Sequence, residues 1–312
     1  MKKFLIAGAV ALMGTTAMAG DIGVSMARFD DNFLTVLRNG IDAYAKDKGQ
    51  TVQIEDAGND VAKQLDQIKN FIASGVTAIV VNPVDTSATQ AMSDAAAAAN
   101  IPLVYVNRQP INVDTLPDNQ AFVASNEVDS GTLETKEVCR LLKEAGKTEA
   151  NVYVIQGELS NQAAVQRTAD IHDVIGGADC GVKVNIIDQQ TSNWQRDQAQ
   201  TLMTNWLSTG TAFDAVIANN DESAIGAIQA MKAANIDMKT VIVGGVDATQ
   251  DALAAMQAGD LDVTVFQNAA AQGSGALDAA MTLAAGGSVD QKVYVPFELV
   301  TPANIADYLK KN

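Results

Sequence analysis

The sequence has 312 residues and a formal net charge of −16, with 47% hydrophobic residues. Such an acidic chain argues against nucleic acid or an anionic membrane surface as a partner. Its length exceeds that of a typical single domain and indicates two. The only histidine is His172, which excludes a histidine-based zinc site and argues against a Ser-His-Asp catalytic system.

The N-terminus has the pattern of a secretory signal peptide. Lys2 and Lys3 precede an apolar run from Phe4 to about Met13, and the small residues of Ala17-Met18-Ala19 form a cleavage site. The apolar run is too short for a transmembrane helix, which needs about 20 residues. We therefore expect residues 1–19 to be removed and the mature protein to be periplasmic, beginning at Gly20.

The chain has two cysteines, Cys139 and Cys180. An oxidising compartment permits them to pair, and neither a CxxC redox motif nor zinc-ligand spacing is present. The sequence leaves two interpretations open, a structural disulfide or two buried free thiols.

Short apolar runs alternate with amphipathic stretches, which predicts strands alternating with helices. The predicted strands cover residues 21–26, 51–56, 78–81, 103–106, 121–125, 151–156, 182–188, 215–218, 240–244 and 262–266. The predicted helices cover residues 33–48, 61–74, 86–99, 134–145, 162–175, 194–207, about 223–234, 250–258 and 272–285. This order favours parallel sheets with right-handed crossovers, without a flexible linker between domains.

Polar side chains follow most of the predicted strands. In the stretch 213–234, the apolar run 215–218 ends in Asn219-Asn220-Asp221-Glu222 just before a helix. Parallel α/β sheets bind ligands at this carboxyl edge. Each tip also has a plainer interpretation: Asp221, Glu222 or Asp247 as a helix cap, Asn82 as a turn before Pro83, and Trp194 as a packing residue. Their shared location favours a binding site.

The chemistry of these tips predicts the class of ligand. Amides offer a donor and an acceptor, arginine offers a fork of donors, and rings such as Phe29, Phe33 and Trp194 offer flat apolar faces. This combination suits a neutral polyhydroxylated molecule. No nucleotide-binding loop of the GxxxxGK[ST] or GxGxxG type occurs, and no calcium loop, so no cofactor or metal is indicated.

Several of these segments together resemble periplasmic sugar-binding proteins of the ribose/galactose type. They are VNPVD (81–85), VNRQ (106–109), ANNDESAIGA (218–227), GGVDATQD (244–251) and the DNF that follows the first strand. The resemblance covers essentially the whole mature chain. It implies two Rossmann-like lobes with parallel sheets joined by a three-crossover hinge, residues 20–125 plus 268–297 and residues 126–267 plus 298–312.

The resemblance also implies a set of ligand contacts between the lobes. The first lobe would supply Asp31, Phe33, Asn82, Asn107 and Arg108. The second lobe would supply Arg167, Trp194, Asn220 and Asp247, with Gln267 at the hinge. The expected protein is a monomeric solute-binding component of an ABC transporter, with an inner-membrane permease as partner. Whether a chemoreceptor also binds it stays open.

One position departs from the pattern of relatives that bind simple aldoses. Those relatives usually have aspartate where this chain has Asn107, and Phe33-Leu34 replaces two successive rings. The stretch 27–40 is similar to relatives associated with inositol or rhizopine uptake, which favours a cyclitol such as myo-inositol. The alternative ligand is a plain aldose such as ribose, xylose or galactose.

Two other functional classes are alternatives to a binding protein. The effector domain of a LacI-type repressor shares this fold, but it requires an N-terminal helix-turn-helix where this chain has a signal peptide. An exported carbohydrate-active enzyme would need an acid–base pair such as Asp30-Asp31 or Asp221-Glu222. Helix capping and acceptance of sugar hydroxyls explain these carboxylates better, so we expect no enzymatic activity.

Overall fold

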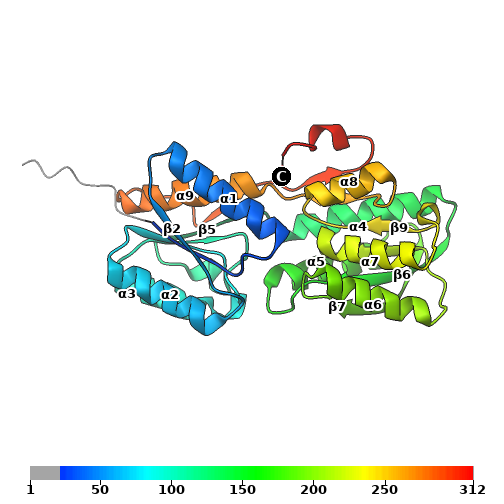
Figure 1. The fold of residues 1–312 in the computed structure, drawn as a ribbon, viewed down its shortest axis with the longest axis horizontal. Coiled ribbons are helices and arrows are strands. Elements are labelled where there is room, and N and C mark those ends of the chain that lie inside the picture. Colours follow the sequence, from blue (N-terminus) through cyan, green and yellow to red (C-terminus); the bar gives the residue numbers. More distant parts are fainter. Residues whose placement is uncertain (1–21, 312) are drawn as a thin grey trace, which may run out of the picture.

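The computed structural model describes residues 22–311, so the predicted signal peptide lies outside the described residues. Two α/β bodies lie side by side, each built on a parallel sheet with helices on both faces (Figure 1). The alternation of strand and helix predicted from the sequence is therefore observed. We call the body that contains β1 the first lobe and the body that contains β6 the second lobe.

The first lobe contains a six-stranded sheet in the order β11-β5-β4-β3-β1-β2, in which every pair is parallel. The strands are β1 (Ile22–Met26), β2 (Val52–Asp56), β3 (Ala78–Val81), β4 (Leu103–Val106), β5 (Gln120–Ala124) and β11 (Lys292–Tyr294). Apolar residues of α1 (Asn32–Asp47) and α9 (Ala269–Ala284) pack on one face. Residues of α2 (Val61–Ser74) and α3 (Thr89–Ala98) pack on the other. Strands β1, β3, β4 and β5 are buried along their whole length, which explains why they are mostly apolar.

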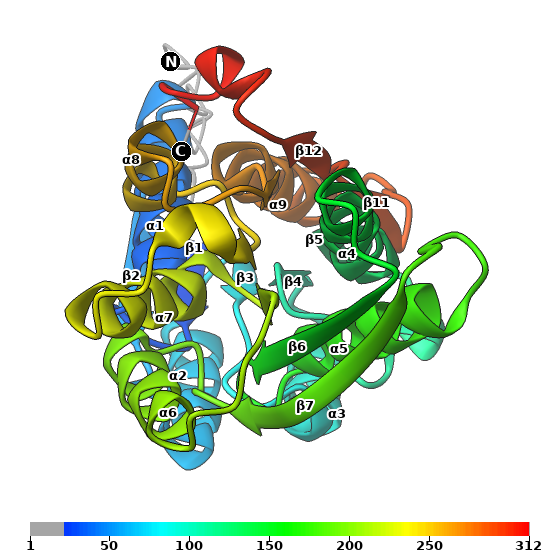
Figure 2. The ribbon, with the colours of Figure 1, turned by 90° about the vertical axis from the view of Figure 1, so that its right-hand side faces the viewer.

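The second lobe contains a four-stranded parallel sheet in the order β7-β6-β8-β9. Its strands are β6 (Glu149–Gln156), β7 (Lys183–Thr191), β8 (Ala215–Ala218) and β9 (Ile242–Gly244). One face is covered by α4 (Glu127–Glu144) and α5 (Gln162–Gly176). The other is covered by α6 (Arg196–Ser208), α7 (Asp221–Ala233) and α8 (Gln250–Ala258) (Figure 2).

A short antiparallel pair, β10 (Thr264–Phe266) and β12 (Glu298–Val300), lies beside β9 in the second lobe. The chain therefore passes between the lobes three times, between β5 and α4, between β10 and α9, and between β11 and β12. Single 3₁₀ turns complete the described elements, at η1 (Thr86–Ala88), η2 (Val113–Thr115), η3 (Met238–Thr240) and η4 (Ile305–Asp307). Among residues 22–311, no helix is long and apolar enough to cross a membrane.

The largest difference from the predicted elements concerns α4, which begins at Glu127 instead of 134. The helix therefore continues through Gly131, although glycine disfavours helix interiors. In the structure this glycine allows a close contact with α5: a Cβ atom at Gly131 would lie 2.5 Å from the carbonyl oxygen of Arg167. The strands β11 and β12 were not predicted, because each is three residues long and lacks an apolar run.

Cys139 and Cys180 form a disulfide within the second lobe, with a Cα–Cα distance of 5.0 Å. The bond joins α4 to the segment between α5 and β7, and both residues are buried in the core on that face of the sheet. Of the two interpretations that the sequence left open, the structure contains the disulfide.

Candidate functional site

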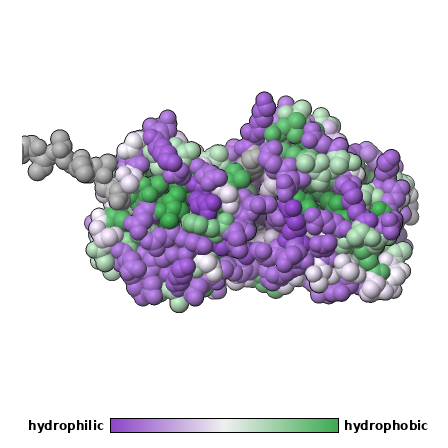
Figure 3. Space-filling view, viewed as in Figure 1, coloured by the Kyte–Doolittle hydropathy of each residue, from purple (hydrophilic) through white to green (hydrophobic). Residues whose placement is uncertain are grey.

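A cavity lies between the lobes, at the carboxyl ends of strands from both sheets. The surface where the lobes meet is mostly hydrophilic (Figure 3). Nine of the ten residues implied by the resemblance line this cavity, namely Asp31, Phe33, Asn107, Arg108, Arg167, Trp194, Asn220, Asp247 and Gln267. The other lining residues are Leu34, Glu127, Asn161 and Ala163.

The wall from the first lobe combines a carboxylate with a guanidinium. Asp31 caps α1, because its Oδ1 accepts from the backbone N–H of Leu34 at 2.9 Å. Burial raises the pKa of this carboxyl, against the opposing effects of the Leu34 N–H, Arg108 and Arg28. Arg108 donates from Nη1 to the carbonyl of Pro83 at 2.9 Å, and burial lowers its pKa to about 10. Both groups are thus oriented at the cavity by hydrogen bonds to the backbone.

Asn82 is the exception among the predicted contacts, because it lies behind the cavity wall. It is fully buried, and its Nδ2 donates to Oδ1 of Asn107 at 3.2 Å. Asn107 in turn donates to Gln272 Oε1 at 3.3 Å, and Gln272 donates to Ser125 Oγ at 2.9 Å. Asn107 has a φ of 68°, in the left-handed region. Asn82 therefore positions Asn107 from behind and is not one of the lining residues.

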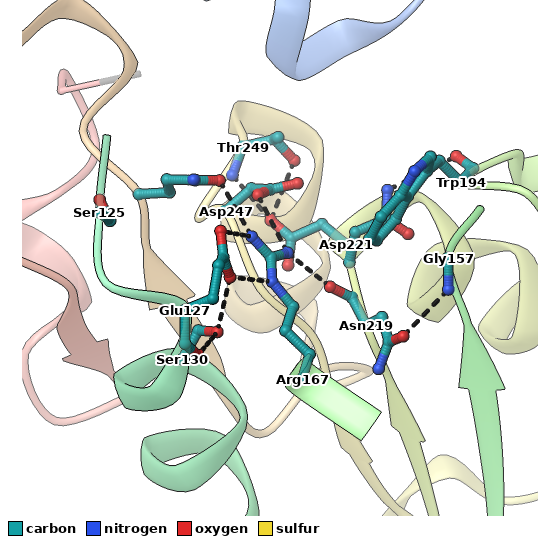
Figure 4. A network of polar contacts seen from close by, with 12 residues as sticks. Ser125, Glu127, Ser130, Gly157, Arg167, Trp194, Asn219, Asp221, Asp247 and Thr249 are labelled. Atoms are coloured by element: carbon teal, nitrogen blue, oxygen red, sulfur yellow. Dashed lines mark hydrogen bonds and ion pairs between the residues drawn. The ribbon is translucent and has the colours of Figure 1, made fainter. Parts of the chain in front are cut away.

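Arg167 is the centre of the wall from the second lobe (Figure 4). Its Nε and Nη2 donate to the two carboxylate oxygens of Glu127 at 2.7 and 3.1 Å, and Nη1 lies 3.9 Å from Asp247 Oδ1. Nη1 also donates to the carbonyl of Asn219 at 2.7 Å. Burial opposes the charge on Arg167, but Glu127 and Asp247 favour it, and its pKa is raised.

Asp247 completes this charged cluster. Burial raises its pKa well above the ordinary value of an aspartate, against the opposing effect of Arg167. Its backbone has a φ of 126°, a conformation that non-glycine residues rarely adopt. Backbone strain of this kind gathers at functional sites, where the surrounding structure holds it in place.

Trp194 lies in a strained turn between β7 and α6, with φ values of 53° at Asn193 and 65° at Trp194. It precedes α6 by two residues, so it does not start that helix as the sequence predicted. Its ring lies over Gly157, where a Cβ atom would come within 2.2 Å of the indole carbons. Its Nε1–H is buried without a hydrogen-bond partner among the described residues.

Of the four lining residues outside the predicted set, two are polar, Glu127 and Asn161. Glu127 is the first residue of α4 and follows the end of β5 at Ala124 by three positions. This place after a strand was the sequence feature that could have indicated its role. Asn161 precedes α5, and its Oδ1 is buried without a hydrogen-bond partner in the described part of the chain.

Asp221, which follows the cavity residue Asn220, has a structural role instead. It accepts from Thr249 N at 2.8 Å and from Thr264 Oγ1 at 2.7 Å, and burial raises its pKa to about 7.

Hydrogen bonds join the two lobes around the cavity. The backbone N–H of Thr86 donates to the carbonyl of Ser160 at 3.1 Å, and Gln162 N donates to Thr86 Oγ1 at 3.1 Å. On another side of the cavity, Asn32 Nδ2 donates to Glu222 Oε1 at 2.7 Å. The lobes are thus in contact in this structure, and most of the residues that line the cavity are buried.

A family model described as a periplasmic binding protein domain matches residues 22–288. The chain belongs to this family. Its members are binding proteins of transporters and not enzymes, and they act in the periplasm. The fold is that of the type I periplasmic binding proteins, as the resemblance implied.

Individual relatives of this periplasmic binding protein cover nearly its whole length. A Rhizobium meliloti protein named "Putative rhizopine-binding protein" is 62% identical over 100% of both chains. The ribose import binding protein of Bacillus subtilis is 31% identical over 90% of this chain and 87% of its own length. An ABC transporter solute-binding protein of Bacillus halodurans, solved with bound myo-inositol, is 38% identical with a TM-score of 0.87, covering 95% of this chain and 100% of that one.

Proposed function

We propose that this protein binds a neutral cyclitol such as myo-inositol in the cavity between its lobes and delivers it to an inner-membrane ABC permease. The observation that carries the proposal is the composition of the cavity wall, where guanidinium, carboxylate, amide and indole groups from both lobes converge. Trp194 Nε1 offers a donor and Asn161 Oδ1 an acceptor that make no hydrogen bond within the described protein. Such groups suit the many hydroxyls of a polyol.

The relatives support a cyclitol over a plain aldose. The Bacillus halodurans structure contains myo-inositol, and a Caulobacter myo-inositol binding protein, 27% identical with a TM-score of 0.82, covers 93% of this chain. The 62% identical relative is named for rhizopine binding. Ribose, xylose and galactose stay the alternative ligands. A relative named for ribose matches 90% of this chain, and one named for galactose matches 98%.

Lobe closure supplies the mechanism of capture. We propose that residues 20–125 plus 268–297 and residues 126–267 plus 298–312 move as two bodies about the three crossings of the chain. A ligand held by Arg108 from one lobe and Arg167 from the other has more contacts in the closed state than in the open one. This differential contact shifts the population towards closure. The permease would then recognise the closed, liganded form.

A thermal-shift screen of cyclitols, pentoses and hexoses tests the ligand class. A ligand that binds only the native state raises the apparent melting temperature by mass action. We expect the largest shift with myo-inositol or another neutral cyclitol. Trp194→Ala should reduce that shift, whereas Trp206→Phe should keep it, because Trp206 stacks on Tyr153 in the core with ring centroids 4.3 Å apart. A shift with an amino acid or peptide, and none with any polyol, would contradict the proposal.

Gly157→Ala is expected to weaken ligand binding at least ~10-fold, about 1.4 kcal/mol. The new methyl group would occupy space within 2.2 Å of the Trp194 ring carbons, so the ring must leave its place in the cavity wall. Gly176→Ala is the matched control, because a Cβ atom there meets nothing within 4 Å. Isothermal titration with myo-inositol measures both. Equal dissociation constants for Gly157→Ala and the wild type would show that the indole position does not matter.

We also propose that residues 1–19 are a cleaved signal peptide and that the mature protein is a monomer. The first proposal rests on the sequence pattern of Lys2, Lys3 and the apolar run that follows. Intact mass and sedimentation of the protein purified from the periplasm check both.

A further inference from the structure

Arg28 extends from the end of β1 in the first lobe and reaches groups of the second lobe. Its Nη2 donates to the carbonyl of Asn193 at 3.3 Å and lies 3.8 Å from Glu158 Oε2. With the Gln195 amide oriented so that Oε1 faces the guanidinium, this oxygen accepts from Nη1 at 2.7 Å and from Nη2 at 3.2 Å. The side chain of Arg28 is only 10% exposed, and it is not among the residues that line the cavity.

The two residues that Arg28 bonds most closely flank Trp194. Asn193 precedes the indole and Gln195 follows it, so the guanidinium spans the turn that carries the ring. Both Asn193 and Trp194 have positive φ values, and residues in such conformations persist only where the surrounding structure holds them. Within the second lobe, the carbonyl of Trp194 accepts a long bond of 3.5 Å from Asn220 Nδ2.

We propose that Arg28 is a positioning residue that fastens the Trp194 turn to the first lobe when the lobes close. It holds the indole over the cavity without contacting the ligand. The choice of ligand in the tests below rests on the function proposed above. The contact of Arg28 with Asn193 and Gln195 does not depend on that choice.

The contact predicts a kinetic effect on release. Arg28 and its partners come from different lobes, so their hydrogen bonds form after the ligand has entered and must break before it leaves. Charge-assisted hydrogen bonds between partly buried groups are the strong ones. We therefore expect Arg28→Met to accelerate ligand dissociation about tenfold while the association rate stays within about twofold, since interface changes act mostly on dissociation.

Stopped-flow fluorescence with myo-inositol measures both rates. A Trp206→Phe background leaves Trp194 as the reporter, because the sequence contains two tryptophans. Arg28→Lys should fall between wild type and Arg28→Met, because it keeps the charge but loses the fork. Arg140→Met is the control, since Arg140 pairs with Glu137 and Glu144 on its own helix. Wild-type dissociation in Arg28→Met would overturn the proposal.

Arg28 also lies 3.9 Å from Asp31, a cavity residue, so its loss could act through that carboxylate instead. A double-mutant cycle with Gln195→Ala separates the two routes. If Arg28 acts by holding the turn, the two changes affect the same contact, and the double variant should release ligand little faster than Arg28→Met alone. Fully multiplicative effects on the rate would show that Arg28 acts elsewhere.

A failure of the ligand assignment is distinguishable from a failure of this contact. If the wild type gives no thermal shift with any polyol, the proposed function fails, and the contact is then tested without ligand. Single-molecule energy transfer between dyes on the two lobes should show a smaller closed fraction in Arg28→Met than in the wild type. An unchanged closed fraction would contradict the role of Arg28.

Discussion

Arg167→Met is expected to abolish ligand binding and to lower the free energy of unfolding by about 3–5 kcal/mol. The guanidinium is 4% exposed and makes two hydrogen bonds to Glu127, whose side chain is 5% exposed. It also lies 3.9 Å from the buried Asp247. Methionine fills much of the same space but leaves both carboxylates without their cation. Breaking a buried pair in this way is costly, because an uncompensated charge stays inside the protein.

The pH dependence of this variant follows from Asp247. Burial already raises the pKa of that carboxyl, so the native state favours its protonated form, and the associated stability is lost as the pH rises through the raised value. Arg167 opposes the increase, and its removal would raise the pKa of Asp247 further. The deficit in the free energy of unfolding of Arg167→Met should therefore be smaller at acidic pH than at neutral pH. Urea unfolding at several pH values measures it.

A second substitution distinguishes structural from binding effects of Arg167. Arg167→Met combined with Glu127→Gln removes both members of the closest ion pair, so part of the lost stability should return. Ligand binding should not return, because the cavity still lacks the donors of the guanidinium. A single variant as stable as the wild type would contradict the structural role of Arg167. A double variant that binds myo-inositol with wild-type affinity would contradict its role in binding.

The sequence predicted the elements of this fold better than the contacts between them. Apolar runs such as 78–81 and 215–218 end in amides and carboxylates, and both signals are local. The sheet order then brings these tips to the same edge of each sheet, which is why nine of the ten predicted residues share one cavity. The strands β11 and β12 were missed because each has three residues and no apolar run, so that only their pairing with β5 and β10 defines them.

Contacts across space explain the errors within the site as well. Nothing near Asn82 in the sequence indicates that Asn107 lies between it and the cavity. The role of Gly157 depends on the ring of Trp194, 37 positions later in the numbering, and Arg28 contacts Asn193 and Gln195 across the two lobes. In the same way, the packing of Gly131 against Arg167 on α5 joins residues that are distant in the sequence.

Replacing both Cys139 and Cys180 by alanine is expected to lower the free energy of unfolding by about 3 kcal/mol while leaving ligand affinity unchanged. The disulfide closes a segment with a sequence separation of 41, and such a cross-link stabilises the fold mainly by restricting the unfolded chain. Both residues lie in the core between α4, α5 and the second sheet, and neither lines the cavity.

Denaturant unfolding of the wild type with and without a reducing agent provides the matched control for the disulfide. Reduction should lower the stability of the wild type close to that of the double variant, and it should leave the double variant unchanged, because the described chain has no other cysteine. Titration with myo-inositol should give the same dissociation constant in both proteins. Equal stability of wild type and double variant would mean that the bond contributes little. A weakened affinity would mean that α4, which begins at the cavity residue Glu127, transmits the loss to the site.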